Sequence, residues 1–239
     1  MAKFEKVNLL NYPIFFMTKE TKCPYLGNKS EKRLVTDLNN NPFLFDELSL
    51  SGFRRIENWM YRPSCSHCNE CKSYRVNINQ FSLTKSLKRI KKNNEEISTS
   101  LKKNLASEEY FDLFSTYQQK RHTGGSMSNM TFEDFKSMIE SSPINTQLCE
   151  FRNKEKKLIG LMLFDHQKDG LSAVYSFYDV KFEKSGLGNF MILELIELAK
   201  KLTLDYVYLG YYIKNAPRMN YKLKFKEGEL YSDGKWTKT

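Results

Sequence analysis

The chain has 239 residues, of which 40% are hydrophobic, and it contains 17 phenylalanines and 14 tyrosines. This composition suits a packed core and excludes an intrinsically disordered chain, which needs low hydrophobicity. No apolar run approaches the roughly 20 residues that span a bilayer, and the N-terminus lacks the apolar core and cleavage site of a signal peptide. We therefore expect a globular, cytoplasmic protein without a membrane partner.

The positive charge of the chain lies in its N-terminal part. The formal net charge is +10. Residues 1–105 contain 19 basic and 10 acidic residues, a net +9, whereas residues 106–239 contain 19 and 18, a net +1. A one-sided basic surface is typical of proteins that bind nucleic acids. The alternative is a charged, solvated face that has no partner.

The first 80 residues predict irregular structure with short strands, and residues 73–81 alternate as one further strand. Residues 85–92 follow with five basic residues and no acidic one. Such a run indicates either contact with phosphate groups or an exposed helix face or linker. The candidates for phosphate contact are Lys85, Lys88, Arg89, Lys91 and Lys92.

The middle of the chain predicts two capped helices and a β-meander. Ser107 is a suitable N-cap for a helix that ends near His122, and Thr131 for a second helix that ends near Glu140. The strands of the meander cover residues 146–152, 158–165 and 171–179. The second of these strands is almost wholly apolar, so we expect it to be buried on both faces.

A glycine-bearing loop separates the last of these strands from a long amphipathic helix. The loop, residues 184–188, contains Gly186 and Gly188, and the helix continues to Lys201. A strand over residues 206–213, a short helix and a terminal strand pair complete the chain. A helix N-terminus flanked by glycine is a natural seat for an anion, although glycines there can also simply cap the helix.

This order of elements, together with residues 220–225, resembles the GNAT fold of acyl-CoA-dependent N-acyltransferases. The resemblance implies an α+β protein with a GNAT-like mixed sheet flanked by helices. In that fold a glycine loop faces the acyl donor, and two parallel strands splay apart to admit it. We predict a Cys-rich, basic domain over residues 1–98 and an acyl-transfer domain over residues 99–239. The alternative is an ordinary α/β domain.

Eight short motifs occur between Cys23 and Trp236. They are CPYL at 23–26, GFRR at 52–55, YRPSCSHCNEC at 61–71, RV at 75–76, RHTGGSM at 121–127, LSAVYSFYD at 171–179, YLGYYI at 208–213 and MNYK at 219–222. Together they resemble the bacterial aspartate/glutamate leucyltransferases, which are relatives of the eukaryotic arginyl-tRNA–protein transferases. The resemblance covers nearly the whole chain.

The resemblance implies an aminoacyltransferase that moves leucine from leucyl-tRNA to the N-terminal Asp or Glu of a protein, which marks that protein for degradation through the N-degron (N-end rule) pathway. The basic run at residues 85–92 and the loop glycines Gly186 and Gly188 would then contact the tRNA. The alternatives are arginyl transfer by the same fold, an acetyl-CoA-dependent N-acetyltransferase, and an RNA-binding module with an inactive acyltransferase fold. We expect a monomer without an organic cofactor.

Acyl transfer from tRNA depends mainly on positioning. The aminoacyl ester is already activated, and an α-amine has a reference pKa of about 7.7–8.0. A hydrogen bond to the developing oxyanion would add to this, from backbone N–H groups around Gly210 or from a tyrosine hydroxyl. For each candidate the alternative is a packed side chain or a satisfied turn carboxylate. The catalytic candidates are Asp165, Tyr175, Asp179, Tyr208 and Tyr211.

An acidic N-terminal residue requires a cationic partner, and the arginine fork matches a carboxylate well. Arg121 is our first choice for this substrate-binding role, and the adjacent His122 is a further candidate. Lys222, Arg54 and Arg75 follow it. A structural salt bridge is the alternative for each of these residues.

Four of the five cysteines lie in the N-terminal part of the chain. Cys65, Cys68 and Cys71 are spaced by two residues each, and Cys23 lies further upstream. Four thiolates could hold zinc or an iron–sulfur cluster, and the related arginyltransferases use N-terminal cysteines in this way. Reduced thiols without metal are the alternative. Cys149 stands alone in a predicted strand, so we expect it to be a small buried residue.

Overall fold

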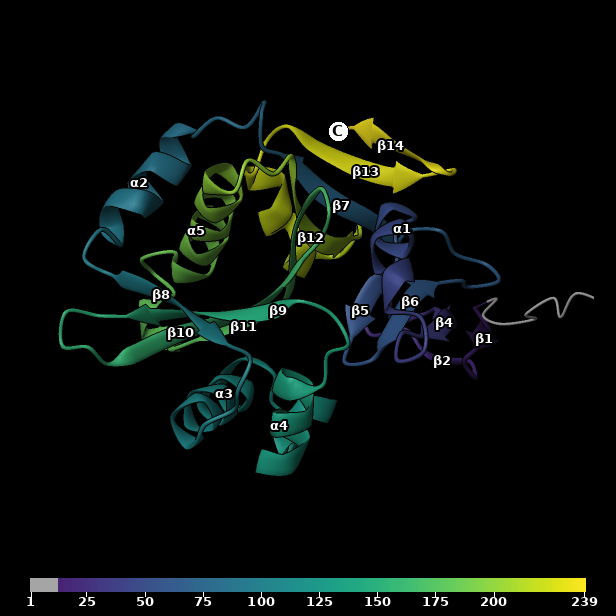
Figure 1. Ribbon diagram of the computed structural model, residues 1–239, viewed down its shortest axis with the longest axis horizontal. Coiled ribbons are helices and arrows are strands. Elements are labelled where there is room, and N and C mark those ends of the chain that lie inside the picture. Colours follow the sequence, from purple (N-terminus) through teal and green to yellow (C-terminus); the bar gives the residue numbers. More distant parts are fainter. Residues whose placement is uncertain (1–12) are drawn as a thin grey trace, which may run out of the picture.

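The computed structural model describes residues 13–239, and an eight-stranded mixed sheet forms its centre (Figure 1). The prediction that the chain has no signal peptide concerns residues 1–12, which lie outside the described residues. The strand order is β14-β13-β7-β12-β11-β10-β9-β8. The strands are β7 (Lys72–Asn77), β8 (Ser98–Lys103), β9 (Thr146–Arg152), β10 (Leu158–His166), β11 (Gly170–Tyr178), β12 (Tyr206–Tyr212), β13 (Gly228–Ser232) and β14 (Lys235–Lys238).

Helices cover both faces of this sheet (Figure 1). Helices α2 (Lys85–Asn93) and α5 (Leu187–Lys201) lie on one face, and α3 (Glu108–Arg121) and α4 (Phe132–Glu140) lie on the other. The predicted caps of α3 and α4 are confirmed. The Ser107 side chain accepts a hydrogen bond from the Tyr110 backbone N–H, and Thr131 forms a capping box with Asp134. Three short 3₁₀ helices accompany them: η2 (Ser126–Asn129), η3 (Val180–Phe182) and η4 (Pro217–Lys224).

Strand β10 separates two hydrophobic cores. Ile159, Met162 and Phe164 belong to the core under α2 and α5. Leu161 and Leu163 belong to the core under α3 and α4. The prediction of a strand buried on both faces is therefore confirmed, because a central strand between two helical layers has no solvated side.

The N-terminal part folds as a small four-stranded sheet beside the large one (Figure 1). Its strand order is β1-β4-β6-β5, and no strand in it exceeds five residues, as the prediction of short strands requires. A compact core of Leu38, Phe45, Leu48, Phe53 and Met60 supports it. Its elements are β1 (Phe16–Met17), β4 (Arg33–Asp37), η1 (Pro42–Leu44), α1 (Phe45–Leu50), β5 (Arg54–Ile56) and β6 (Trp59–Pro63), with a separate hairpin of β2 (Thr21–Lys22) and β3 (Ser30–Glu31).

The division at residue 98 stays a prediction. Strand β7, from the first predicted domain, is an internal strand of the large sheet and lies between β13 and β12. Helix α2, also from that domain, packs against α5. Strand β8 was not predicted, because its polar sequence is that of an exposed edge strand and only pairing with β9 orders it.

Strands β11 and β12 are parallel and then diverge. Their pairing covers residues 170–172 of β11 and residues 206–208 of β12. Beyond that point, within the part of the chain that the structure describes, β11 pairs only with β10, and β12 pairs only with β7. The predicted GNAT-like mixed sheet with a strand splay is therefore confirmed. Within residues 13–239 no helix has the length and apolarity that crossing a membrane requires.

Candidate active site

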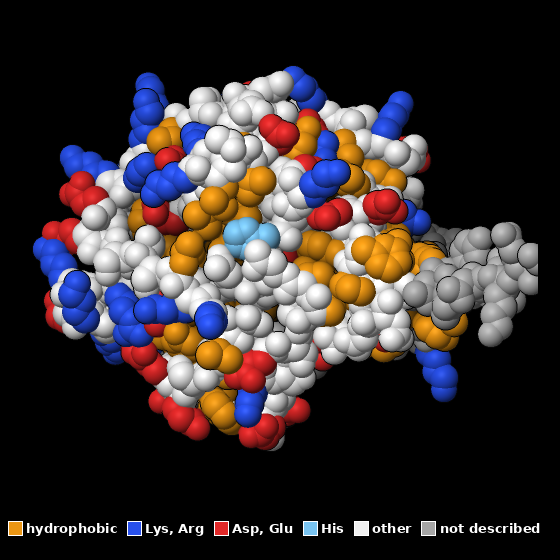
Figure 2. Space-filling model, in the orientation of Figure 1, with side chains coloured by type: hydrophobic (Ala, Val, Ile, Leu, Met, Phe, Trp, Pro, Cys, Tyr) orange, Lys and Arg blue, Asp and Glu red, His pale blue; other side chains and the backbone are white. Residues whose placement is uncertain are grey.

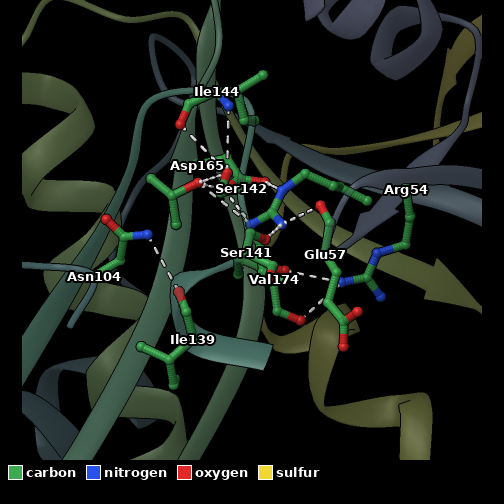
Figure 3. Close-up of polar contacts among 12 residues, drawn as sticks. Arg54, Glu57, Asn104, Ile139, Ser141, Ser142, Ile144, Asp165 and Val174 are labelled. Carbon is green, nitrogen blue, oxygen red and sulfur yellow. Dashed lines mark hydrogen bonds and ion pairs between the residues drawn. The ribbon is translucent and has the colours of Figure 1, made fainter. Parts of the chain in front are cut away.

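The strand splay contains the side chain of Arg54. This arginine comes from β5 of the small sheet, and its Nη2 donates hydrogen bonds to the carbonyl oxygens of Ala173 (2.9 Å) and Val174 (3.3 Å) on β11 (Figure 3). On the opposite strand, Gly210 has a positive φ of 77°, and a Cβ there would lie 2.0 Å from Arg54 Nη1. Only glycine adopts this positive φ readily and also leaves the space that the arginine occupies. The splay of the large sheet is thus filled by a cation from the small sheet.

Arg54 has no acidic partner among the described residues. Its polar contacts in residues 13–239 are with backbone carbonyls, and none of the ion pairs there includes it. The guanidinium also lies 6.0 Å from the ring centre of Tyr211. An arginine held by neutral acceptors keeps its full charge available to a carboxylate that enters the splay.

Lys222 lies close to this cation and is almost completely buried. Its Nζ donates a hydrogen bond to the Tyr211 carbonyl oxygen and lies 3.6 Å from the Met219 sulfur. Burial holds the pKa of Lys222 well below its usual range, and the charge of Arg54 lowers it further. Lys222 therefore supports the backbone of β12 and is poorly suited to bind the carboxylate of a substrate.

Among the candidate tyrosines, Tyr208 and Tyr211 have hydroxyl groups whose protons already have acceptors within the protein. The Tyr211 hydroxyl lies within hydrogen-bond distance of the carbonyl oxygens of Gly52 (3.1 Å) and Tyr61 (2.9 Å), which share its one proton and join β12 to the small sheet. The Tyr208 hydroxyl donates to Asp169 (2.8 Å) and accepts from Arg75 (3.0 Å).

Tyr175 is placed differently from the other two. Its hydroxyl accepts a hydrogen bond of 2.7 Å from Gln118 Nε2, and no acceptor for its own proton is found among the described residues. Burial raises the pKa of Tyr175, so the hydroxyl keeps that proton at neutral pH. Tyr175 lies on the part of β11 that has left β12, one residue after the carbonyl that Arg54 contacts.

The two candidate carboxylates have structural partners. Asp165 is fully buried and receives two hydrogen bonds of 2.7 Å from Arg55 and one of 2.7 Å from Thr146 (Figure 3). Asp179 accepts the Lys181 backbone N–H at the start of η3 (3.1 Å). Asp165 therefore holds the small sheet to the large one, and we propose no direct catalytic role for it.

The other cationic candidates lie outside the splay. Arg75 is buried, pairs with Glu229 (2.7 Å), and has its guanidinium 3.6 Å from the ring centre of Tyr206 and 4.2 Å from that of Trp236. Arg121 is partly exposed and forms an ion pair with Glu183.

His122 ends helix α3. Burial, together with the charges of Arg218 and Arg121, lowers its pKa. The imidazole therefore stays mostly neutral at neutral pH and is a weak partner for a carboxylate.

The glycine loop and the basic helix lie against each other. Gly186, at the start of α5, has a positive φ of 81°, and a Cβ there would lie 3.0 Å from Ile90 of α2. A Cβ on Gly188 would lie 3.0 Å from the ring of Tyr178. Leu87 and Ile90 are buried, whereas Lys85, Lys88, Arg89 and Lys92 are exposed, and Figure 2 shows basic side chains on the side of the molecule that carries α2.

The four N-terminal cysteines converge on one small pocket. Cys23, Cys65, Cys68 and Cys71 all line a cavity of about 20 Å³ between the small sheet and the end of β12. The Leu26 backbone N–H donates to Cys23 Sγ (3.4 Å). Burial and the neighbouring thiols raise the pKa of Cys71 to about 12. The four soft donors suit zinc or iron, although no group of ligands within residues 13–239 has the arrangement of a formed metal site.

Comparison with known proteins shows the family to which the chain belongs. Residues 109–232 match the family profile described as "Arginine-tRNA-protein transferase, C terminus", and residues 21–89 match the corresponding N-terminus profile. The aspartate/glutamate leucyltransferase of Ruegeria pomeroyi is 39% identical over 227 residues, which cover 94% of this chain and 83% of that protein. The chain belongs to the aspartate/glutamate leucyltransferase family. It is therefore an aminoacyltransferase.

Other leucyltransferases match equally well. That of Paramagnetospirillum magneticum is 39% identical over 93% of this chain and 92% of its own length, and that of Granulibacter bethesdensis is 38% identical over 93% and 84%. Among solved structures, the L-PGS of Bacillus licheniformis has a TM-score of 0.47 and 11% identity, and covers 60% of this chain and 46% of its own. The fold assignment rests on the sheet topology instead.

Some residues at the candidate site were not predicted from the sequence. Gln118 orients the Tyr175 hydroxyl from α3, and Arg55 neutralises Asp165 from β5. The sequence signal for Arg55 is its position beside Arg54 in the GFRR motif. Gln118 has no distinguishing signal, because one glutamine on a helix is usually solvated.

Proposed function

We propose that this chain transfers leucine from leucyl-tRNA to the N-terminal Asp or Glu of acceptor proteins. The single observation that carries the proposal is Arg54, a cation without an acidic partner among the described residues, placed in the strand splay of an acyltransferase fold. We further propose that the enzyme acts as a monomer in the cytosol. The added leucine would mark the acceptor for degradation.

The chemistry of the reaction asks for positioning above all. The neutral α-amine attacks the carbonyl carbon of the aminoacyl ester, and the new C–N bond forms as the ester C–O bond breaks. The terminal ribose oxygen of the tRNA leaves as a hydroxyl, with the proton that the amine nitrogen loses. Holding amine and ester in reach of each other can supply about 7–11 kcal/mol of the barrier. No organic cofactor is needed, because the ester is already activated.

Arg54 is the favoured reader of the acidic side chain. It lies inside the splay, and its fork is held by neutral carbonyl groups. Arg121 was the first choice from the sequence, but it already pairs with Glu183 at an exposed position. Arg75 is buried against Glu229 and two aromatic rings. A substrate carboxylate would have to displace an existing partner from either of them.

Tyr175 is the favoured donor to the oxyanion. Gln118 fixes its hydroxyl oxygen, so the proton points elsewhere, and the raised pKa keeps that proton in place. Backbone N–H groups of β12 around Gly210, on the edge that faces the splay, are the second source of donors. Asp179, Tyr208 and Tyr211 would serve by holding η3 and the two sheets together.

The tRNA would lie along α2 and reach the splay past the glycine loop. The exposed basic side chains of α2 can contact phosphates, and the N-terminus of α5 offers backbone N–H groups to an anion. The side chains around Tyr175 are apolar and aromatic, which favours leucine over arginine as the transferred residue. Arginyl transfer is the second candidate.

One assay tests the proposed reaction. The protein is incubated with radiolabelled leucyl-tRNA, arginyl-tRNA or acetyl-CoA and with peptides that begin with Asp, Glu, Arg or Met. We expect label to pass from leucyl-tRNA to the Asp and Glu peptides. Label that passes from acetyl-CoA alone would overturn the proposal, and label from arginyl-tRNA alone would change the donor.

The role of Arg54 is tested by Arg54→Met, which removes the charge and keeps a long side chain in the splay. We expect the preference for an Asp peptide over the matching Asn peptide to fall roughly 10- to 100-fold, the value of a charged hydrogen bond. Arg62→Met is the control, because Arg62 lies on β6 near Phe53 and donates to the Ser51 carbonyl oxygen. An unchanged preference in the Arg54 variant would exclude this role.

We also propose that Cys23, Cys65, Cys68 and Cys71 hold zinc or an iron–sulfur cluster as a structural or regulatory group. The support is the convergence of four thiols on one pocket. Protein purified without oxygen should contain stoichiometric zinc or iron, and Cys71→Ser should lose it. Cys149→Ser, which alters a buried thiol of the large sheet, should keep the metal. Absence of both metals from the unaltered protein would contradict the proposal.

A further inference from the structure

The end of α2 is fastened to the glycine loop by a buried amide. Asn94 follows α2 directly and is 2% exposed. Its Nδ2 donates to the carbonyl oxygen of Ile90 (2.8 Å) and to that of Ser185 (2.9 Å). The Ser185 hydroxyl donates in return to Asn94 Oδ1 (2.9 Å). Asn94 and Ser185 therefore exchange two hydrogen bonds across 91 residues of sequence.

The contacts around this amide leave little freedom between helix and loop. Ile90, one turn before Asn94, packs against Gly186 so closely that a Cβ on that glycine would lie 3.0 Å from it. The Ser185 hydroxyl also lies 2.8 Å from the Phe182 carbonyl oxygen, inside the same loop. Lys91 lies 3.7 Å from Glu197 of α5. Helix α2 and the glycine loop, which lie far apart in the sequence, are thus held in one arrangement.

A buried amide is an unusual choice for packing alone. Burial of a polar group costs free energy unless its hydrogen bonds are made, and an apolar side chain would fill the same space without that cost. The benefit of the amide is direction, because its bonds fix the loop at one register relative to the helix. What is fixed is the distance between the basic face of α2 and the N-terminus of α5.

We propose that Asn94 is a positioning residue, which holds the glycine loop relative to the basic face of α2 so that a tRNA bound on α2 presents its aminoacyl end at the strand splay. This inference rests on the proposed function. Asn94 itself contacts neither the tRNA nor the reacting ester. Loss of its bonds leaves the basic surface intact and allows the loop to drift from the splay.

The test separates binding of the tRNA from transfer. Asn94→Ala is compared with the unaltered enzyme for its affinity for tRNA, measured directly, and for the single-turnover rate of leucine transfer at saturating leucyl-tRNA. We expect the transfer rate to fall about 10- to 100-fold, because displacements near 1 Å cost that much. We expect tRNA affinity to change less than about twofold, because phosphate contacts determine it.

The control is Asn104→Ala, whose amide bonds the Ile139 carbonyl oxygen (3.3 Å) on the other face of the sheet, and which should keep the transfer rate. Ser185→Ala, which deletes one hydroxyl, should also lower the transfer rate and keep tRNA affinity, with a smaller effect on the rate. This variant tests the inference if Asn94→Ala does not fold. A transfer rate that is unchanged, or that falls only in parallel with affinity and melting temperature, overturns the inference. Failure of the unaltered enzyme to transfer leucine would instead reject the proposed function.

Discussion

The tyrosine hydroxyls around the splay show how a single hydrogen-bond partner decides what a residue can do. The hydroxyl protons of Tyr208 and Tyr211 are donated to Asp169 and to two backbone carbonyls, so those residues join elements together. The Tyr175 hydroxyl accepts from Gln118, and residues 13–239 offer no acceptor for its own proton. Chemically identical side chains therefore have different uses in the same sheet.

Tyr175→Phe removes this hydroxyl without changing the ring. We expect kcat for leucyl transfer to fall about 100-fold or more, in the range of one lost oxyanion donor, while KM for the acceptor peptide stays nearly constant. Tyr110→Phe is the matched control, since its hydroxyl bonds Glu150 (2.8 Å) away from the splay. An unchanged kcat in the Tyr175 variant would leave the backbone N–H groups of β12 as the oxyanion donors.

At the scale of elements, Glu150 joins three of them. It lies on β9 and accepts hydrogen bonds from Tyr110 of α3 (2.8 Å) and Ser100 of β8 (3.0 Å), as well as from Arg152 (2.8 Å). The hydrogen bonds from Arg152, followed by those from Tyr110 and Ser100, lower the pKa of this carboxyl to about 2. The edge strand β8 and helix α3 thus depend on an ionised side chain.

This gives the stability of the protein a defined pH dependence. The folded state lowers the pKa of Glu150, so its contribution is present above about pH 4.5 and is lost as the pH falls toward 2. The difference in free energy of unfolding between the unaltered protein and Glu150→Gln should shrink by about 3 kcal/mol over that interval. Urea unfolding at several pH values measures it.

The control for this experiment is Glu96→Gln, which removes an exposed carboxylate paired with Lys154. Solvent screens such an exposed pair, so we expect its loss to leave the dependence of stability on pH nearly unchanged. If the Glu150→Gln difference were the same at pH 6 and pH 3, the carboxylate would not be the group that holds these elements together.

At the scale of the whole molecule, the candidate site depends on the contact that fixes the small sheet to the large one. The buried Arg55–Asp165 pair makes this connection, with side chains that are 1% and 0% exposed. The adjacent residue Arg54 then enters the splay. Trp236 of β14 adds a hydrogen bond of 2.9 Å to the Leu50 carbonyl oxygen. The proposed reader of the acidic substrate and the contact between the two sheets thus involve two consecutive arginines.

Asp165→Asn tests this connection, because it leaves the buried Arg55 charge without compensation. We expect a loss of about 3–5 kcal/mol in the free energy of unfolding, measured in urea. Asp205→Asn, at an exposed carboxylate that accepts from Asn79, should cost about 0.5 kcal/mol or less. A comparably small loss for Asp165→Asn would mean that other contacts carry the interface.

Elements that local sequence patterns define were predicted, whereas elements that depend on their three-dimensional neighbours were not. The caps at Ser107 and Thr131, the apolar strand β10 and the order of strand, glycine loop and helix are local patterns, and each was predicted. Strand β8 and helix α1 were not, because a polar edge strand and a six-residue helix gain their order from neighbours rather than from periodicity.

The sequence by itself determined the family, the GNAT-like order of elements and the basic character of the N-terminal part, since motifs, periodicity and charge can be read along the chain. Only the tertiary structure decided which cation enters the splay. Arg54 meets Ala173 across 119 residues, and Asp165 meets Arg55 across 110. Side-chain partnership over such distances depends on how the two sheets dock, and neither local propensity nor spacing encodes it.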